Sequence, residues 1–360
     1  MVHSSSRPLI PDCTLAQLEQ IEDISNLVCH ELRTPLTSIQ GVLKILHNEQ
    51  FANFSEDGER LLGIAISAAN RLTRLANAIE HRSEAIPSML SLEDMKRLKL
   101  GNDLVCALSR QEFFLDYQPI ISITDDRVIG FEALARWNHP DQGVISPTVF
   151  IPLAEKSGLI QPLGLSLLEQ ACQQLWIWQR EFPSDPPISM SINLSSVQLS
   201  QSDLSQKIQE ILLRTGVTPE TLKLEITESA LMENQDRALD NILNLKEIGV
   251  KVHLDDFGTG YSSLARLQDF PFDALKIDKS FILSQNWIVS EAILLLASRL
   301  QLDVVAEGIE TLEQLQSLRK IGCDKVQGYY FSRPVNNRSA SQLLARKTED
   351  YRVHVSSSSP

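Results

Sequence analysis

The sequence predicts an α/β protein in which a closed (β/α)₈ barrel follows an α-helical hairpin. The barrel is expected at residues 93–345, because short β-branched runs alternate there with amphipathic helical segments. The hairpin is expected at residues 14–83, where apolar residues recur at three- and four-residue steps. A doubly wound open sheet is the alternative to the barrel. The glycine fingerprint of dinucleotide binding is absent, because residues 258–263 lack its third glycine.

Strands are predicted in the barrel region at residues 128–137, 188–194, 222–227, 250–254, 274–277, 304–306 and 325–327. Helical segments between them are predicted at residues 163–178, 204–214, 236–248, 290–300 and 312–321. Because helical segments separate most of these strands, we expect a parallel sheet.

The rest of the chain divides into a flexible arm at residues 1–13, a linker at 84–92 and a flexible tail at 346–360. Residues 51–58 interrupt the helical pattern, so two long helices form an αα-hairpin. A single hairpin cannot bury both of its apolar faces. We therefore expect a second copy to pair with it in a homodimeric four-helix bundle.

Composition excludes several kinds of partner. The net charge is -13 and the sequence pI is about 5.1, which argues against binding DNA or an anionic membrane surface. The five cysteines form no CxxC pair, so reduced thiols and a cytoplasmic location are expected. No apolar run is long enough for a membrane span, and the first residues lack the apolar region of a signal peptide.

Polar residues recur at the ends of the predicted strands, where barrel enzymes carry their chemistry. They are Glu132, Asn193, Glu225, Glu228, Asp255, Asp256, Lys276, Asp278, Glu307 and Gln327. One such acid alone is more often a helix N-cap or a solvated charge. Five or six in one barrel would be costly to bury without metal. Carboxylates with one amide and no His or Cys form a hard-oxygen set, which selects Mg²⁺ or Mn²⁺ over Zn²⁺.

The predicted strand at residues 128–137 also places an arginine, Arg136, near these acids. Its period of two puts Glu132, Leu134 and Arg136 on one face. Glu132 can therefore hold a metal ion while Arg136, further along the strand, reaches an anionic substrate.

Ordered motifs then carry a resemblance to a known family. The sequence reads EAL at residues 132–134 and DDFGTGYSSL at 255–264. It also reads FLDYQPI at 114–120, SINLS at 191–195, LEITE at 224–228, LKIDK at 275–279, AEGIE at 306–310 and QGYYFSRP at 327–334. In this order the motifs resemble the EAL family of cyclic di-GMP phosphodiesterases, whose fold is a TIM-like barrel, over about residues 93–345.

The resemblance implies hydrolysis of one phosphodiester of cyclic di-GMP to linear pGpG with two Mg²⁺ or Mn²⁺ ions. The implied metal ligands are Glu132, Asn193, Glu225, Asp255, Asp256 and Glu307, with Asp255 bridging the two ions. Lys276 is implied to orient the attacking water, and Glu307 is either the general base or a ligand of the second ion. The implied substrate contacts are Gln118, Leu134, Arg136, Asp278 and Gln327.

The same resemblance implies that Glu228 anchors the loop after Asp256, and that this loop links the metal site to a dimer surface. None of the implied metal or catalytic positions departs from the family pattern. We therefore expect an active enzyme. The alternative is a receptor that binds cyclic di-GMP without hydrolysing it.

Residues 29–37 read CHELRTPLT and resemble the phosphoacceptor segment of histidine-kinase dimerisation domains, over about residues 15–83. His30 is the implied phosphoacceptor. No ATP-binding domain follows residue 83, so the chain is not expected to phosphorylate itself. Two interpretations stay open: the hairpin only dimerises the protein, or a separate histidine kinase or response regulator phosphorylates His30 to regulate it. A phosphorelay adaptor that uses the barrel as a scaffold is a further alternative.

Overall fold

The computed structural model describes residues 100, 101, 103–232, 234–258 and 266–345. The chain divides into two compact units, Met1–Lys96 and Arg97–Pro360, and the described residues all belong to the second. The predicted arm, helical hairpin, linker and tail lie outside the described residues, as does His30.

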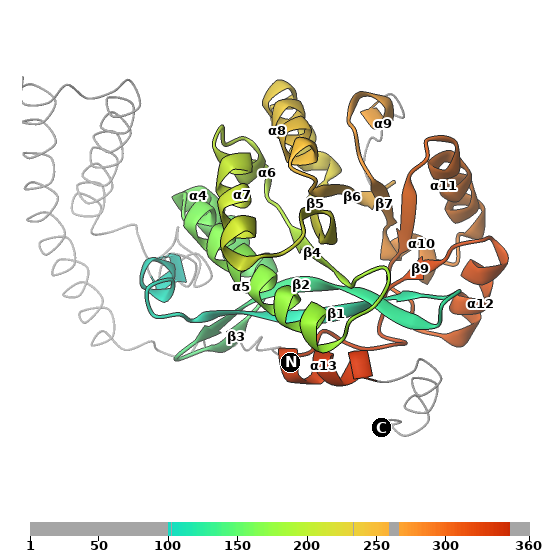
Figure 1. Cartoon of the computed structure of the whole chain (residues 1–360), viewed down its shortest axis with the longest axis horizontal. Coiled ribbons are helices and arrows are strands. Elements are labelled where there is room, and N and C mark those ends of the chain that lie inside the picture. Colours follow the sequence, from blue (N-terminus) through green and yellow to red (C-terminus); the bar gives the residue numbers. More distant parts are fainter. Residues whose placement is uncertain (1–99, 102, 233, 259–265, 346–360) are drawn as a thin grey trace, which may run out of the picture. The chain divides into compact units, whose positions relative to one another are not determined.

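Within the described residues, eight strands close into a barrel (Figure 1). They are β1 (Phe113–Ser122), β2 (Arg127–His139), β4 (Ser189–Asn193), β5 (Leu222–Thr227), β6 (Lys251–Phe257), β7 (Ala274–Ile277), β8 (Asp303–Ala306) and β9 (Lys325–Val326). The short strand β3 (Gly143–Ile145) pairs only with β2. Pairing of β1 with both β9 and β2 completes the closure. The closed barrel is confirmed, and the open sheet is excluded.

Helices pack around the outside of the barrel (Figure 1). They are α4 (Pro147–Ser157), α5 (Ile160–Glu181), α6 (Ser196–Leu199), α7 (Leu204–Thr215), α8 (Gln235–Glu247), α9 (Arg266–Asp269), α10 (Lys279–Leu283), α11 (Trp287–Arg299), α12 (Leu312–Lys320) and α13 (Asn337–Ala345). Two 3₁₀ helices, η2 (Pro219–Thr221) and η3 (Glu228–Met232), flank β5. Among the described helices, none combines the length and the apolar character of a membrane span.

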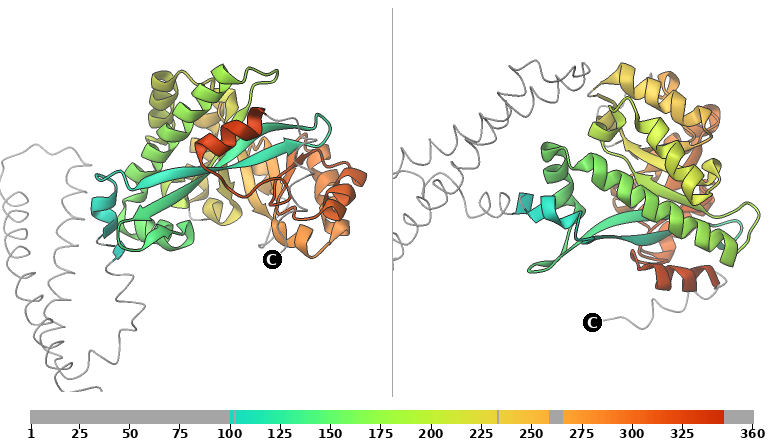
Figure 2. Two further views of the ribbon diagram at one scale, coloured as in Figure 1. Left: turned by 90° about the horizontal axis from the view of Figure 1, so that it is seen from below. Right: turned by 60° about the vertical axis from the view of Figure 1, so that its left-hand side comes forward.

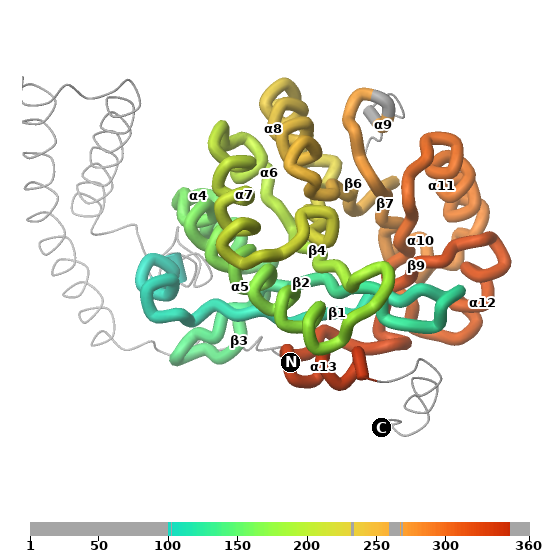
Figure 3. Tube along the Cα trace, viewed as in Figure 1, coloured from blue at the N-terminus to red at the C-terminus, as the bar shows by residue number. Residues whose placement is uncertain are grey.

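The direction of β1 differs from the expected parallel sheet. β1 runs antiparallel to both β2 and β9, whereas the other barrel strands pair in parallel. The four residues between β1 and β2 are too few for a parallel crossover, so the two strands form a hairpin. Its turn lies beside α12, where Arg319 donates to the backbone oxygen of Ile123 at 3.2 Å (Figure 3). The hairpin places Gln118 opposite Glu132.

The hydrophobic core lies between the barrel and its helices. Alternate residues of β5 and β6, such as Leu224, Ile226 and Val252, face outward and are almost fully buried. The residues between them, such as Glu225 and His253, face the barrel interior. Burial of the outward side chains under the helices therefore stabilises the fold and leaves the interior for polar groups.

An aromatic cluster fastens α5 to the β1–β2 hairpin. The ring of Trp178 lies 4.7 Å from that of Phe131 and 4.8 Å from that of Tyr117. The indole N–H of Trp178 donates to Ser341 Oγ of α13 at 2.8 Å. Helix α13 therefore lies across the hairpin (Figure 2).

Replacing Trp178 with Ala should lower the free energy of unfolding by about 3–5 kcal/mol, because it leaves a large cavity at this junction. The control is Leu213→Ala, since Leu213 is 78% exposed; its effect should stay within about 0.5 kcal/mol. Urea unfolding of both variants measures the difference. Equal losses in the two variants would contradict the assignment of Trp178 to the core.

Candidate active site

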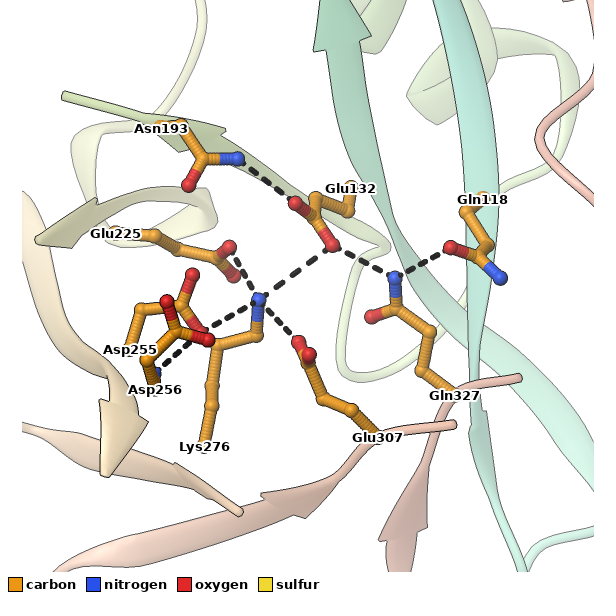
Figure 4. A network of polar contacts seen from close by, with 9 residues as sticks. All are labelled: Gln118, Glu132, Asn193, Glu225, Asp255, Asp256, Lys276, Glu307 and Gln327. Carbon is orange, nitrogen blue, oxygen red and sulfur yellow. Dashed lines mark hydrogen bonds and ion pairs between the residues drawn. The ribbon is translucent and has the colours of Figure 1, made fainter. Parts of the chain in front are cut away.

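One lysine stands at the centre of the site. Lys276 of β7 is 1% exposed, and its ammonium contacts four carboxylates (Figure 4). Its Nζ lies 2.5 Å from Glu225 Oε2 and 2.5 Å from Glu307 Oε1. It also lies 3.4 Å from Glu132 Oε2 and 3.4 Å from Asp255 Oδ1. The four acids come from or directly follow β2, β5, β6 and β8, so closing the barrel brings them together.

Amide side chains orient Glu132 from two sides. Asn193 Nδ2 donates to Glu132 Oε1 at 2.8 Å, and Gln327 Nε2 donates to Glu132 Oε2 at 2.7 Å. Gln327 Nε2 also donates to Gln118 Oε1 at 3.0 Å, and Gln118 Nε2 donates to the backbone oxygen of Ser332 at 3.3 Å. Both oxygens of Glu132 are therefore held in place by neighbours from other strands.

The adjacent acids Asp255 and Asp256 lie in a β-bulge near the end of β6. On a regular strand, neighbouring side chains point to opposite faces. In β6, however, Leu254 and Phe257 both pack into the core, and the register with β7 shifts between them. Asp256 adopts the left-handed backbone conformation, with φ 54°, and its N–H donates to Asp255 Oδ1 at 3.0 Å. Few residues other than glycine adopt this conformation, and Asp does so more readily than most.

Burial raises the pKa of three of the acids. It raises the pKa of Glu225 well above its usual value, with Lys276 opposing this shift and the neighbouring carboxylates adding to it. Burial likewise raises the pKa of Glu307 to about 7, against the opposing effect of Lys276. Desolvation also raises the pKa of Asp256, together with repulsion from Asp255 and Asp278.

Lys276 and Glu132 remain charged instead. Burial alone would lower the pKa of Lys276, but the surrounding carboxylates raise it well above its usual value. Burial alone would raise the pKa of Glu132. The Lys276 ammonium and the hydrogen bonds from Gln327 and Asn193 outweigh that effect, so its pKa is lowered.

The donor atoms fit a hard divalent cation by their chemistry. Among the described residues, no group of three His, Cys, Asp or Glu side chains has the arrangement of a metal site. The reason is visible in Figure 4: the carboxylates converge on the Lys276 ammonium. One oxygen of Glu225, Oε1, is nevertheless buried without a hydrogen-bond partner among the described residues. A buried carboxylate oxygen of this kind favours a cation nearby.

The predicted substrate contacts divide between two places. Gln118 and Gln327 join the network around Glu132, and Leu134 and Arg136 follow Glu132 along β2. Asp278 is the N-cap of α10, where its carboxylate accepts from the Ser280 N–H at 2.9 Å, so its position also has a structural explanation. Glu228 begins η3, but residues 259–265 of the loop that it was expected to anchor lie outside the described residues.

Asp116 was not identified from the sequence. It lies on β1 opposite Leu134, on the same face as Gln118, and its Oδ2 lies 2.9 Å from Arg136 Nε. Treating residues 113–122 as a strand paired with residues 127–139 would have placed it there. The sequence motif alone did not reveal that pairing.

Glu307 should make the stability of the metal-free protein depend on pH. Its pKa is about 7 when folded and near 4.5 when unfolded, so between these values the folded state holds the extra proton. Stability therefore falls as pH rises from about 4.5 to 7, by at most about 3 kcal/mol. Urea unfolding in a chelator should show this fall in wild type relative to Glu307→Gln. Burial lowers the pKa of His253 in both proteins, and this makes stability rise with pH. The contribution of Glu307 is therefore the difference between the wild-type and Glu307→Gln profiles. Parallel profiles would contradict the raised pKa.

Two family models match the chain. The EAL domain model matches residues 102–334. The His Kinase A (phospho-acceptor) domain model matches residues 20–85, which include His30. The first match covers the barrel, and the second covers most of the predicted helical hairpin.

The chain is also similar to curated proteins. An uncharacterized signaling protein of Caulobacter vibrioides is 44% identical over 244 residues, covering 66% of this chain and 29% of that protein. Cyclic di-GMP phosphodiesterase NbdA of Pseudomonas aeruginosa is 34% identical over 340 residues, covering 92% of this chain and 43% of that protein. The chain thus spans less than half the length of these two relatives.

A solved structure supports the same assignment. The PaMucR phosphodiesterase in its c-di-GMP complex is 39% identical, with a TM-score of 0.64, and the match covers 67% of this chain and 99% of that chain. The fold, the order of the motifs and the family model therefore agree, and the chain belongs to the EAL family.

Proposed function

We propose that this protein hydrolyses one phosphodiester bond of cyclic di-GMP to give linear pGpG. The observation that carries the proposal is the convergence of Glu132, Glu225, Asp255 and Glu307 on Lys276 at one end of an EAL barrel. A relative named as a cyclic di-GMP phosphodiesterase and a similar phosphodiesterase structure in complex with c-di-GMP support this substrate.

The proposed reaction requires two Mg²⁺ or Mn²⁺ ions. EAL phosphodiesterases are metal-dependent as a class. When bound, the ions would lower the pKa of a water molecule and offset the negative charge of the phosphate. The proposed ligands of the first ion are Glu132, Asn193, Glu225 and Asp255. Those of the second are Asp255 and Asp256, joined by Glu307 if Glu307 is not the general base.

Lys276 is proposed to act as a fixed positive charge. Its pKa is raised well above the usual value, so it cannot serve as a base near neutral pH. Its buried ammonium would orient the attacking water and stabilise negative charge that develops on the phosphate oxygens. Glu307 is proposed to accept the proton of that water, because in the metal-free protein its pKa is raised to about 7 and it is thus a stronger base than an ordinary carboxylate. Its alternative role is to hold the second ion.

The N-terminal unit is proposed to dimerise and regulate the barrel. The match of the phospho-acceptor domain model to residues 20–85, which include His30, supports this proposal. We propose that two chains pair through this segment, and that a separate histidine kinase or response regulator phosphorylates His30. The loop after Asp256 would carry that signal to the metal site, with Glu228 as its anchor.

Removing the charge of Lys276 should abolish turnover. Lys276→Met keeps much of the side-chain length and removes the positive charge. We expect kcat to fall by at least about 100-fold in this variant. Glu132→Ala should cause a loss of similar size. Turnover is measured as pGpG released from cyclic di-GMP by the full chain with Mg²⁺ or Mn²⁺. The control is Lys207→Met, whose lysine forms an exposed pair with Asp203. Wild type that binds cyclic di-GMP and releases no pGpG would instead identify a receptor.

Metal binding and proton transfer can be separated with two variants. Asp256→Asn removes a ligand charge, so it should raise the Mn²⁺ concentration for half-maximal turnover by on the order of tenfold. Glu307→Gln keeps an oxygen ligand but cannot accept a proton, so it should lower kcat with little change in Mn²⁺ affinity. Calorimetric titration of Mn²⁺ measures affinity without turnover. Loss of Mn²⁺ affinity in Glu307→Gln would assign Glu307 to the second ion instead.

A further inference from the structure

An ion pair on the β1–β2 hairpin controls the geometry of Arg136. Asp116 lies opposite Leu134 in the hairpin register, one pleat away from Arg136 on the same face. Its Oδ2 lies 2.9 Å from Arg136 Nε, and the two side chains are only 21% and 18% exposed. Arg136 Nη1 donates to the backbone oxygen of Ala135 at 2.9 Å. The guanidinium is therefore held at two of its three nitrogens.

The contacts of Arg136 leave one edge of its guanidinium for a ligand. A guanidinium has five N–H donors, and the two contacts use Nε and one N–H of Nη1. The remaining donors lie on Nη1 and Nη2. Two such donors in one plane match two oxygens of a single phosphate group.

The same hairpin face leads directly to the candidate active site. Gln118 follows Asp116 by two residues on β1, and Glu132 precedes Arg136 by four residues on β2. Alternation places all four side chains on the inner face of the hairpin. A phosphate at the free edge of Arg136 would therefore belong to the same ligand that reaches Glu132.

Asp116 has two opposing effects on an anionic ligand. Its negative charge repels a phosphate and partly cancels the charge of Arg136. Its hydrogen bond also fixes a long side chain before the ligand arrives, so less conformational freedom is lost on binding. Repulsion at the partly solvated barrel mouth is screened by water and salt, whereas the gain from a fixed geometry is not. The positioning effect should therefore exceed the repulsion.

We propose that Asp116 is a positioning residue, which holds Arg136 so that its free edge binds one phosphate of the cyclic dinucleotide. The inference rests on the proposed function, since it assigns a role within the same substrate site. Asp116 would touch Arg136 and not the reacting atoms. Its removal should consequently weaken substrate binding and leave the chemical step nearly unchanged.

Steady-state kinetics of Asp116→Ala, which has no side-chain oxygen to accept from Arg136 Nε, tests the proposal. We expect KM for cyclic di-GMP to rise about tenfold, with kcat within about twofold of wild type. In an Arg136→Ala background the same substitution should have no further effect on KM. The matched control is Asp203→Ala, because Asp203 forms an exposed ion pair with Lys207 at 2.6 Å. That control should leave KM unchanged.

Several outcomes would overturn the proposal. A lower KM in Asp116→Ala would show that Asp116 acts only by repulsion. An unchanged KM, or an equal rise in the Arg136→Ala background, would show that it does not act through Arg136. If wild type binds cyclic di-GMP without hydrolysing it, the proposed function fails, and calorimetric Kd values of the same variants decide the role of Asp116. If wild type does not bind cyclic di-GMP, both proposals are wrong.

Discussion

The site depends on the contacts between the buried ammonium of Lys276 and four carboxylates. Four carboxylates surround it in a space almost closed to water, and burying that many like charges without a cation would be very costly. The single positive charge of Lys276 cannot neutralise all four carboxylates. Burial therefore raises the pKa of Glu225 well above its usual value and that of Glu307 to about 7, which favours their protonated forms when no metal ion is bound. Such a site is prepared to exchange protons for divalent cations.

The interior of the barrel is polar below this site as well. His253 and Ser191 lie two residues before Asp255 and Asn193 on the same inward faces, and both are nearly fully buried. Burial and the nearby lysines lower the pKa of His253 well below its usual value, which keeps it neutral. Barrel interiors are more often filled by branched apolar side chains. Here the outer layer between strands and helices supplies the hydrophobic stabilisation, so the interior can carry charge.

Much of the barrel could be predicted from the sequence, because buried strands and amphipathic helices have different periods. Predicted strands such as 222–227 and 274–277 match β5 and β7 residue for residue. The strand at 113–122 was missed, since alternation there is masked by burial on both faces. Without that strand, the antiparallel hairpin and the Asp116–Arg136 pair could not be foreseen. The cap that Asp278 forms with the Ser280 N–H was likewise not foreseen, and the substrate contact expected of Asp278 stays a prediction.

The sequence by itself determined the fold class, the family and the residue types at the strand ends, because these depend on local periodicity and on the order of motifs. Tertiary structure decided how those residues meet. Closure of the barrel brings Glu132 and Glu307, which lie far apart along the chain, to one ammonium. The bulge at Asp256 interrupts the strand alternation that would point the side chains of two adjacent acids to opposite faces of the sheet. Distances between strands and local departures from their period are properties of packing, which no single segment of sequence specifies.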